Sequence, residues 1–430
     1  MRALLPLISC FCLAAAERPW TEEYPVEASA ANKVCQGKDY GACRTHLVRL
    51  MELLDGRVDI AYKLAKAEAG LGRRDEALKW LAVYSKSGLT FADPSSDPVF
   101  AGLRAGPAFA ALTSALATAH QPVTSSQLFT TLSQNDLVVE DIAYDPAGQR
   151  FYVSSVRHRK ILSIDRTGKE TEFLPEGQPG VWSVMALAVD SQRRYLWAST
   201  VATPEAIGYR SADEGRSALL KYSVDTGKFL KRYDLPAGAQ HALGDMTVSA
   251  AGDVYVSDGH GPVYWVDHAK DTLQPLIEPG TFRSPQTPAL SPDQRRLFVP
   301  DYSRGISIVD LGNRRTALLA HPPELSLGGI DGLYLAGRTM LAIQNGTEPE
   351  RIIRMQLDPS LTRITSWEIV EANWPELGDP THGVIVGQQF YYIANSGWDK
   401  FGDGGVLKPG AAFTPATIRV MPLNGNSRKR

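Results

Sequence analysis

The chain has 430 residues, a formal net charge of −2 and 21% charged residues. This length is enough for two domains with a large core. The nearly balanced charge excludes a strongly basic protein that binds nucleic acid or an anionic membrane surface through lysine and arginine. We therefore expect no nucleic-acid partner.

The first segment, residues 1–16, is typical of a secretory signal peptide. Arg2 precedes an apolar run, and three alanines at 14–16 provide a cleavage site. The run is too short to span a membrane, and no later segment is apolar enough, so we expect no transmembrane anchor. The tetrapeptide LISC at 7–10 is similar to a lipobox, but apolar residues continue past Cys10, which disfavours a lipid anchor. The sequence predicts an exported protein, periplasmic or extracellular.

A helical domain is expected over residues 28–120. Cys35 and Cys43 remain after removal of the signal peptide, and two cysteines eight residues apart in an exported protein favour one disulfide. The stretch AYKLAKAEAGLGRRDEALKWLAVYSKSG, residues 61–88, has helical periodicity on both sides of a glycine turn. It resembles a tetratricopeptide repeat, which implies either a docking arm for a protein partner or a structural cap on the next domain.

Six copies of one strand pattern fill residues 126–423. Each copy has an apolar strand, a tight turn, a strand rich in Tyr, Phe and Val, a polar loop and a further strand. Starts about 40 to 60 residues apart are the period of a β-propeller blade. The copies begin at Glu140, Met185, Gly244, Gln286, Asp331 and His382. The sequence thus predicts an all-β six-bladed propeller preceded by a small all-α domain and followed by a basic tail, residues 424–430.

The sixth copy ends one strand short, after residues 417–421. The segment 127–132 precedes the first full copy and has a strand pattern of its own. We expect it to complete the sixth sheet and close the ring, because closure removes an exposed sheet edge.

Alignment of the six copies places their first residues at one mouth of the central channel. The loops between the second and third strands should return to the same face. These positions and loops supply the side chains expected to bind a small-molecule substrate: Arg157, His158, Tyr209, Asp245, Tyr302, Asn345, Asn395 and Trp398.

Several carboxylates converge on the same mouth, among them Glu140, Asp141, Asp245 and Asp331. Carboxylates in a partly desolvated channel repel one another unless one is protonated or a cation lies between them. A hard divalent ion is one solution. The alternative is that these acids cap strand ends or pair with a channel arginine such as Arg157.

The propeller segment resembles the regucalcin/gluconolactonase family, within the superfamily that also holds paraoxonases and strictosidine synthase. The resemblance rests on Glu140 at the opening of the first blade, Gln286 in QTPALSPDQ and Asp331 in IDGLYL. It implies that these three residues bind one divalent cation, expected to be Ca²⁺, with Mg²⁺, Mn²⁺ and Zn²⁺ as alternatives. Two departures stand out: Gln286 replaces the Asn of the family, and Gly244 stands where the family often carries Asn.

The activity implied by the resemblance is hydrolysis of lactones or related esters. The ion would polarise the carbonyl group, while Asp331, His382 or His260 transfers the proton. The second hypothesis is a propeller without catalytic activity that binds a ligand or a protein and uses the helical domain for docking. The sequence leaves both hypotheses open.

Overall fold

A computed structural model describes residues 18–236 and 238–425 of the chain. The expected signal peptide and residues 426–430 of the expected basic tail lie outside the described residues. Among the described residues, no helix has both the length and the apolar character needed to cross a membrane.

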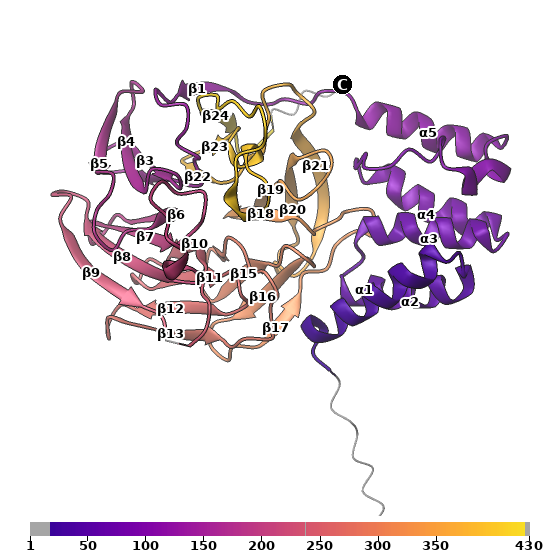
Figure 1. Ribbon diagram of the computed structural model, residues 1–430, viewed down its shortest axis with the longest axis horizontal. Coiled ribbons are helices and arrows are strands. Elements are labelled where there is room, and N and C mark those ends of the chain that lie inside the picture. The colour runs from indigo at the N-terminus through magenta and orange to yellow at the C-terminus, as the bar shows by residue number, and fades with distance from the viewer. Residues whose placement is uncertain (1–17, 237, 426–430) are drawn as a thin grey trace, which may run out of the picture.

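Helices form the first part of the described chain, and they stand at one side of a ring of strands (Figure 1). The first helix starts at Trp20, eight residues before the expected start of the helical domain. Tyr62 and Tyr84 meet edge to face, with 5.0 Å between ring centroids, in the apolar core of this region. The helices are α1 (Trp20–Gln36), α2 (Tyr40–Leu53), α3 (Val58–Gly70), α4 (Arg74–Lys86), η1 (Pro98–Leu103) and α5 (Pro107–Ala119).

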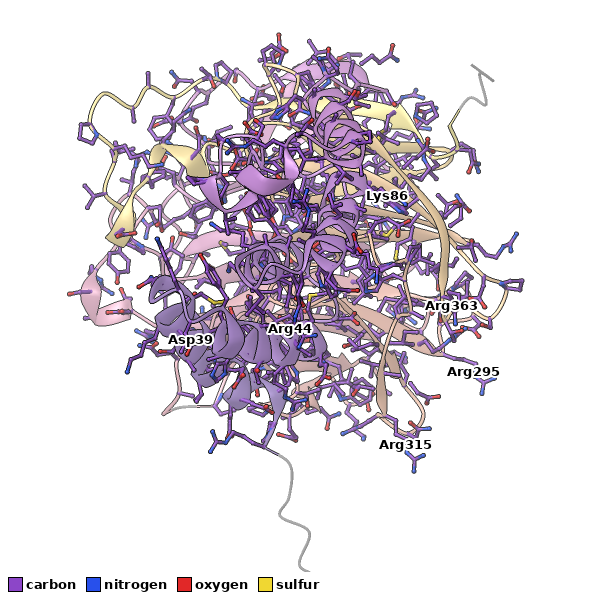
Figure 2. All side chains as sticks on the ribbon, turned by 90° about the vertical axis from the view of Figure 1, so that its right-hand side faces the viewer. Asp39, Arg44, Lys86, Arg295, Arg315 and Arg363 are labelled. Carbon is purple, nitrogen blue, oxygen red and sulfur yellow. A yellow bond between two sulfur atoms is a disulfide. The ribbon has the colours of Figure 1, made fainter. Side chains whose placement is uncertain are left out.

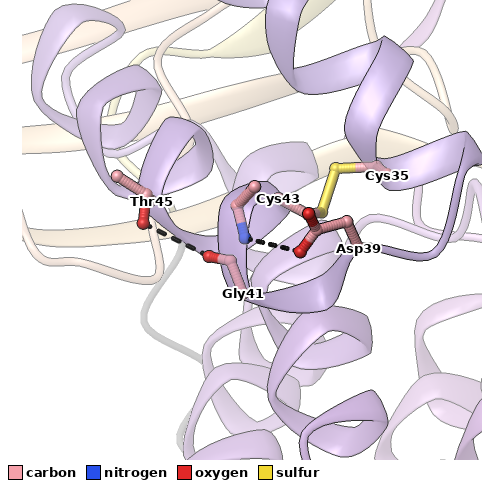
Figure 3. The surroundings of a disulfide bond; sticks show 6 residues. Cys35, Asp39, Gly41, Cys43 and Thr45 are labelled. Carbon is pink, nitrogen blue, oxygen red and sulfur yellow. Dashed lines mark hydrogen bonds between the residues drawn. A yellow bond between two sulfur atoms is a disulfide. The ribbon is translucent and has the colours of Figure 1, made fainter.

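A disulfide between Cys35 and Cys43 connects the end of α1 to the start of α2 (Figure 3). The two Cα atoms are 4.9 Å apart. Asp39 is the N-cap residue directly before α2, and its side chain accepts a hydrogen bond of 3.1 Å from the backbone N–H of Ala42. This side chain satisfies one of the amide groups that a helix start leaves without a partner.

The strands form six four-stranded antiparallel sheets around a central axis (Figure 1). This confirms the predicted six-bladed propeller. Blade 1 contains β2 (Ile142–Asp145), β3 (Arg150–Ser155), β4 (Lys160–Asp165) and β5 (Glu170–Leu174). Blade 2 contains β6 (Ser183–Asp190), β7 (Tyr195–Val201), β8 (Ser217–Ser223) and β9 (Phe229–Asp234). Blade 3 contains β10 (Leu243–Val248), β11 (Val254–Asp258), β12 (Val263–Asp267) and β13 (Thr272–Ile277).

The other half of the ring repeats this order. Blade 4 contains β14 (Ala289–Leu290), β15 (Arg296–Pro300), β16 (Ile306–Asp310) and β17 (Thr316–Leu318). Blade 5 contains β18 (Ile330–Ala336), β19 (Thr339–Gln344), β20 (Arg351–Leu357) and β21 (Ile364–Ala372). Blade 6 contains β22 (Gly383–Val386), β23 (Gln389–Ile393) and β24 (Thr417–Pro422), together with β1 (Gln127–Thr131).

The ring closes through β1, which is the outer strand of blade 6 and pairs antiparallel with β24. Gln127 lies opposite Val420, and Thr131 lies opposite Thr417. The backbone N–H of Leu132 continues the ladder with a 2.9 Å hydrogen bond to the carbonyl of Ala416. The start of the propeller thus completes the sheet that its end begins, as the sequence predicted.

Two sets of loops share one face of the propeller. Each loop that enters an inner strand lies against the loop between the second and third strands of the same blade. The backbone N–H of Tyr302 donates to the carbonyl of Ser284 over 2.9 Å, and that of Gly259 donates to Ala242 over 2.9 Å. We call this side the loop face.

The helical region contacts loops of this same face. Trp20 Nε1 donates a 2.9 Å hydrogen bond to the carbonyl of Thr281, and the backbone N–H of Thr90 donates to Glu348 over 2.7 Å. The fully buried Arg351, at the start of β20, donates from Nη1 to the carbonyl of Ser87 over 2.6 Å. Seen from the helical side, the helices cover the propeller behind them (Figure 2). These contacts fasten the helices beside blades 4 and 5.

Candidate functional site

Three inner strands bring Glu140, Asp331 and His382 to one place near the axis. Glu140 lies just before β2, Asp331 is the second residue of β18, and His382 directly precedes β22. All three side chains are buried, and each offers an atom that lies within 4.8 Å of the atoms offered by the other two. We call these residues the carboxylate–histidine centre.

Hydrogen bonds from the surrounding loops hold both carboxylates in place. Trp398 Nε1 donates to Glu140 Oε2, and Asn345 Nδ2 donates to Asp331 Oδ2 over 2.7 Å. The hydroxyl of Tyr302 donates to Asn345 Oδ1 over 3.1 Å, which fixes the orientation of the amide. The other oxygens, Glu140 Oε1 and Asp331 Oδ1, each lie 4.0 Å from a ring nitrogen of His382. These two oxygens are therefore the ones that face the interior of the centre.

His382 supplies positive charge to this acidic site. Its Nδ1 donates a 2.8 Å hydrogen bond to the backbone carbonyl of Glu140. Its Nε2 lies 2.9 Å from Asp245 Oδ1, although this contact lacks the alignment of a hydrogen bond. Burial disfavours the charged imidazolium, but the carboxylates of Asp245 and Asp331 outweigh it and raise the pKa of His382 well above its usual value.

The carboxyl groups of the centre are harder to ionise than free ones. Burial raises the pKa of Glu140 well above its usual value and that of Asp331 to about 6, while His382 opposes both shifts. Burial also raises the pKa of Asp141 to about 7. Asp141 accepts hydrogen bonds from the backbone N–H groups of Ile142 and Leu187, at 2.7 and 2.6 Å, and so joins blade 1 to blade 2.

A cavity of about 350 Å³ lies over the centre on the loop face. Six of the side chains expected from the sequence line it: Glu140, Gln286, Tyr302, Asp331, Asn345 and Trp398. Gln286 donates from Nε2 to Ser284 Oγ over 3.0 Å, which leaves its carbonyl oxygen for other partners. Asp245 contacts the same centre through His382, with 2.9 Å between Asp245 Oδ1 and His382 Nε2.

The structure places other expected substrate-binding and catalytic residues away from this cavity. Both ring nitrogens of His158 are occupied, by Glu176 at 3.1 Å and by Asp136 at 3.0 Å. His260 is exposed on the loop between β11 and β12. Asn395 Oδ1 accepts a 2.8 Å hydrogen bond from the backbone N–H of Thr417, inside blade 6.

Arg157 and Tyr209 also lie elsewhere. Arg157 is 3.5 Å from Asp136 and stacks over the rings of Phe401 and Phe413, so it does not neutralise the carboxylates of the centre. Tyr209 belongs to a different and larger pocket at the edge of blade 2. Loop residues aligned by sequence can end far apart, because loops of unequal length fold differently.

Sequence reasoning did not select three residues that line the cavity, namely Ser284, Asp379 and Thr381. Burial raises the pKa of Asp379 to about 6, and the nearby Asp331 adds to this shift. All three lie on loops that enter inner strands. Positions in these loops cannot be aligned between the copies of the repeat, because the repeating pattern begins only at the inner strand.

The residues of the centre fit a divalent cation. Two oxygen ligands of one Ca²⁺ can be about 5 Å apart at most, since each lies about 2.3–2.6 Å from the ion. The candidate ligand atoms of Glu140, Asp331 and His382 satisfy this limit. His382 would ligate an ion only as a neutral imidazole, after loss of the Nε2 proton, and two carboxylates with one neutral imidazole would also suit Mn²⁺ or Zn²⁺. Without an ion, the imidazolium of His382 is the cation beside these carboxylates, and not Arg157, the channel arginine named as one alternative.

The fold and this centre define a six-bladed propeller with a buried carboxylate–histidine cluster on its axis. No family model matches the chain, and no curated protein matches it. Solved structures do match. A gluconolactonase from Xanthomonas campestris is 15% identical, with 71% of this chain and 93% of that chain aligned and a TM-score of 0.48.

A calcium-binding protein, regucalcin, from Agrobacterium tumefaciens is also 15% identical, with 70% and 96% of the two chains aligned and a TM-score of 0.48. A virginiamycin B lyase from Staphylococcus aureus is 14% identical, with 68% and 97% aligned and a TM-score of 0.45. A gluconolactonase and a regucalcin are thus among the structural neighbours. At these identities the likeness concerns the fold, so the functional argument rests on the residues.

Proposed function

We propose that this protein is a divalent-cation-dependent hydrolase of lactones or related esters. The observation that carries the proposal is the meeting of Glu140, Asp331 and His382 beneath a cavity of about 350 Å³. A cavity of this size suits a small cyclic ester. Gln286 is the proposed third oxygen ligand, and Ca²⁺ is the first candidate ion.

A cation bound here would polarise the carbonyl group of the ester and stabilise the negative charge that develops on its oxygen. The side chains of the chain have roles of their own. Asp331 has a pKa of about 6 in the ion-free centre, and as a carboxylate it would accept a proton from water. Asn345 and Tyr302 hold Asp331 in one orientation. Trp398 forms an apolar wall and fixes Glu140.

Two parts of the chain outside the propeller belong to the same proposal. Residues 1–16 would direct export and be removed, which would place the enzyme in the periplasm or outside the cell. The helical region would serve as a cap or as a docking arm for a protein partner. The hydrogen bonds from Thr90 to Glu348 and from Arg351 to Ser87 favour the cap, because they fix the helices against the loop face.

A second candidate function is supported by the position of His382. Its contact with Asp245, at 2.9 Å, gives the acidic centre a positive charge from within the protein. A centre neutralised in this way needs no cation. It would suit a propeller that binds a small ligand without catalysis.

Calorimetric titration with Ca²⁺, Mg²⁺, Mn²⁺ and Zn²⁺, followed by thermal unfolding and assays on a panel of lactones, separates the two candidates. The hydrolase proposal expects saturable binding of one ion per chain and an increase in Tm. In the variant Asp331→Asn, the increase in Tm should disappear, and kcat/KM should fall at least 100-fold, because one charged ligand and the proton acceptor are lost together.

The matched control is Asp165→Asn. Asp165 ends β4 and accepts hydrogen bonds only within its own turn, from Thr167 and Lys169, so both properties should be preserved. Ion-independent hydrolysis or the absence of any ion binding would contradict the proposal. The absence of binding together with saturable binding of a lactone, without turnover, would favour the non-catalytic propeller.

A further inference from the structure

A pocket larger than the central cavity lies at the edge of blades 1 and 2, apart from that cavity. Its volume is about 700 Å³, against about 350 Å³ for the central cavity, and the two share no lining residue. One wall is the loop between β5 and β6, and the other is the insertion 202–216 between β7 and β8. The function proposed above does not use this pocket.

The insertion is held in a fixed shape, so the pocket is formed before any ligand arrives. The backbone N–H of Ala202 donates to the carbonyl of Arg216 over 2.9 Å, which closes the base of the insertion. The backbone N–H of Ile207 donates to Arg157 over 2.9 Å, which fastens its tip to blade 1. Asp213 accepts hydrogen bonds from Arg210 and Arg216 and braces the middle.

The pocket carries an excess of positive charge. Arginines and aspartates that line it give a net charge of +2: Arg159, Arg210, Arg216 and Arg232 against Asp213 and Asp234. The guanidinium groups of Arg232 and Arg216 lie 4.8 and 5.1 Å from the ring of Trp182, so that two cations are held beside one aromatic wall. Such a lining attracts anions that also have an apolar face.

Arg159 differs from the other three arginines. Arg210 and Arg216 pair with Asp213, and Arg232 pairs with Asp234 at 2.6 Å. Within residues 18–236 and 238–425, Arg159 forms no ion pair, and its buried Nε has no hydrogen-bond partner. No acidic side chain of the described residues therefore neutralises the charge of this guanidinium group, which can pair with an anion in the pocket. The guanidinium group lies at the pocket wall next to Gly208, whose turn leaves room for it.

We propose that this pocket binds a small organic anion that carries a planar ring. Arg159 would receive the anionic group, a phosphate or a carboxylate, through charge-assisted hydrogen bonds. The ring would lie against the aromatic side of the pocket, which includes Trp182, Tyr209 and Phe229. The site is independent of the carboxylate–histidine centre and of the cation proposed there.

Calorimetric titration of the full chain with phenyl phosphate, benzoate and inorganic phosphate tests this site. Phenyl phosphate or benzoate should bind saturably with one site per chain, and whichever binds identifies the anionic group. Inorganic phosphate should bind at least tenfold more weakly than phenyl phosphate, since it lacks the ring. Equal affinity for these two ions, or no saturable binding of either ring compound, would overturn the proposal.

Three variants locate the binding. Arg159→Gln should weaken binding at least tenfold, because it removes the charge and the bidentate donors. Arg295→Gln removes one charge from an exposed arginine between β14 and β15 of blade 4 (Figure 2), which does not line the pocket, and should leave the affinity unchanged. Equal losses in both variants would indicate attraction by net charge alone and refute the site. Asp331→Asn should leave binding intact, and a loss there would place the anion in the central cavity instead.

Discussion

Truncation of Leu132 to alanine tests the closure of the ring. Leu132 is 1% exposed and lies in a core cluster with Phe151, Ile393 and Ile418, which belong to the first and last blades. The change removes three side-chain carbon atoms, worth about 2.4 kcal/mol at about 0.8 kcal/mol each. The residual cavity adds to this, as in other leucine truncations that cost about 2–5 kcal/mol. We expect a loss of about 3 kcal/mol in the free energy of unfolding.

The matched control for this variant is Leu128→Ala, at the second residue of β1 in the same segment. Leu128 is 54% exposed, so its truncation should cost less than about 0.5 kcal/mol. Urea titration followed by tryptophan fluorescence gives both values from the midpoints and the slope. Equal effects of the two substitutions, or a cost below about 1 kcal/mol for Leu132→Ala, would refute the argument that this segment closes the core. Deletion of the chain up to Leu132 should lower the free energy of unfolding more than deletion up to His120, because only the longer deletion removes β1 and opens the ring.

The remaining predictions concern a covalent link and a buried acid. Cys35→Ala should lower the stability of the helical region by about 2 kcal/mol, since a crosslink between residues eight apart restricts the unfolded chain. Thermal unfolding followed by circular dichroism should show the same loss when the native protein is treated with a reductant. The reductant should have no effect on the double variant Cys35→Ala, Cys43→Ala. Burial raises the pKa of Glu350 to about 7, so its favourable contribution to stability is complete at acidic pH, below the pKa of a free carboxyl, and is lost as pH rises through 7. Glu350→Gln should therefore exceed the native protein in stability by about 2 kcal/mol at pH 8 and match it below pH 5. As a control, the substitution of the exposed Glu376 by Gln should change stability by less than about 0.5 kcal/mol at pH 8. A Glu350 variant that is less stable than the native protein at pH 8 would contradict this assignment.

The repeating pattern of strands was readable in the sequence because it depends on local chemistry. Alternating apolar residues and tight turns recur in six copies, and each copy forms one blade. The unpaired strand at the start and the missing strand at the end also predicted the closure between β1 and β24. The placement of Glu140, Asp331 and His382 followed from the same register, since each lies at or just before the start of an inner strand, where the blades meet near a common axis.

Loop conformation was not readable in this way. The sequence grouped His158, His260, Tyr209 and Asn395 with the central residues, but the structure places each of them outside the central cavity. Asp379, which lines the cavity, was not selected. Loops between blades differ in length and lack periodicity, so their side chains are positioned by contacts with distant parts of the chain.

The sequence by itself determined the architecture of this protein: a helical region, six blades, the strand that closes the ring and the acidic residues near its axis. These features follow from local periodicity and from the geometry of closed sheets. Only the tertiary structure decided how the charges are balanced. It placed His382 against Asp245, left Arg159 without an acidic partner in the described chain, and fixed the helices on the loop face. Charge pairing between distant segments depends on positions in space, which local patterns do not encode.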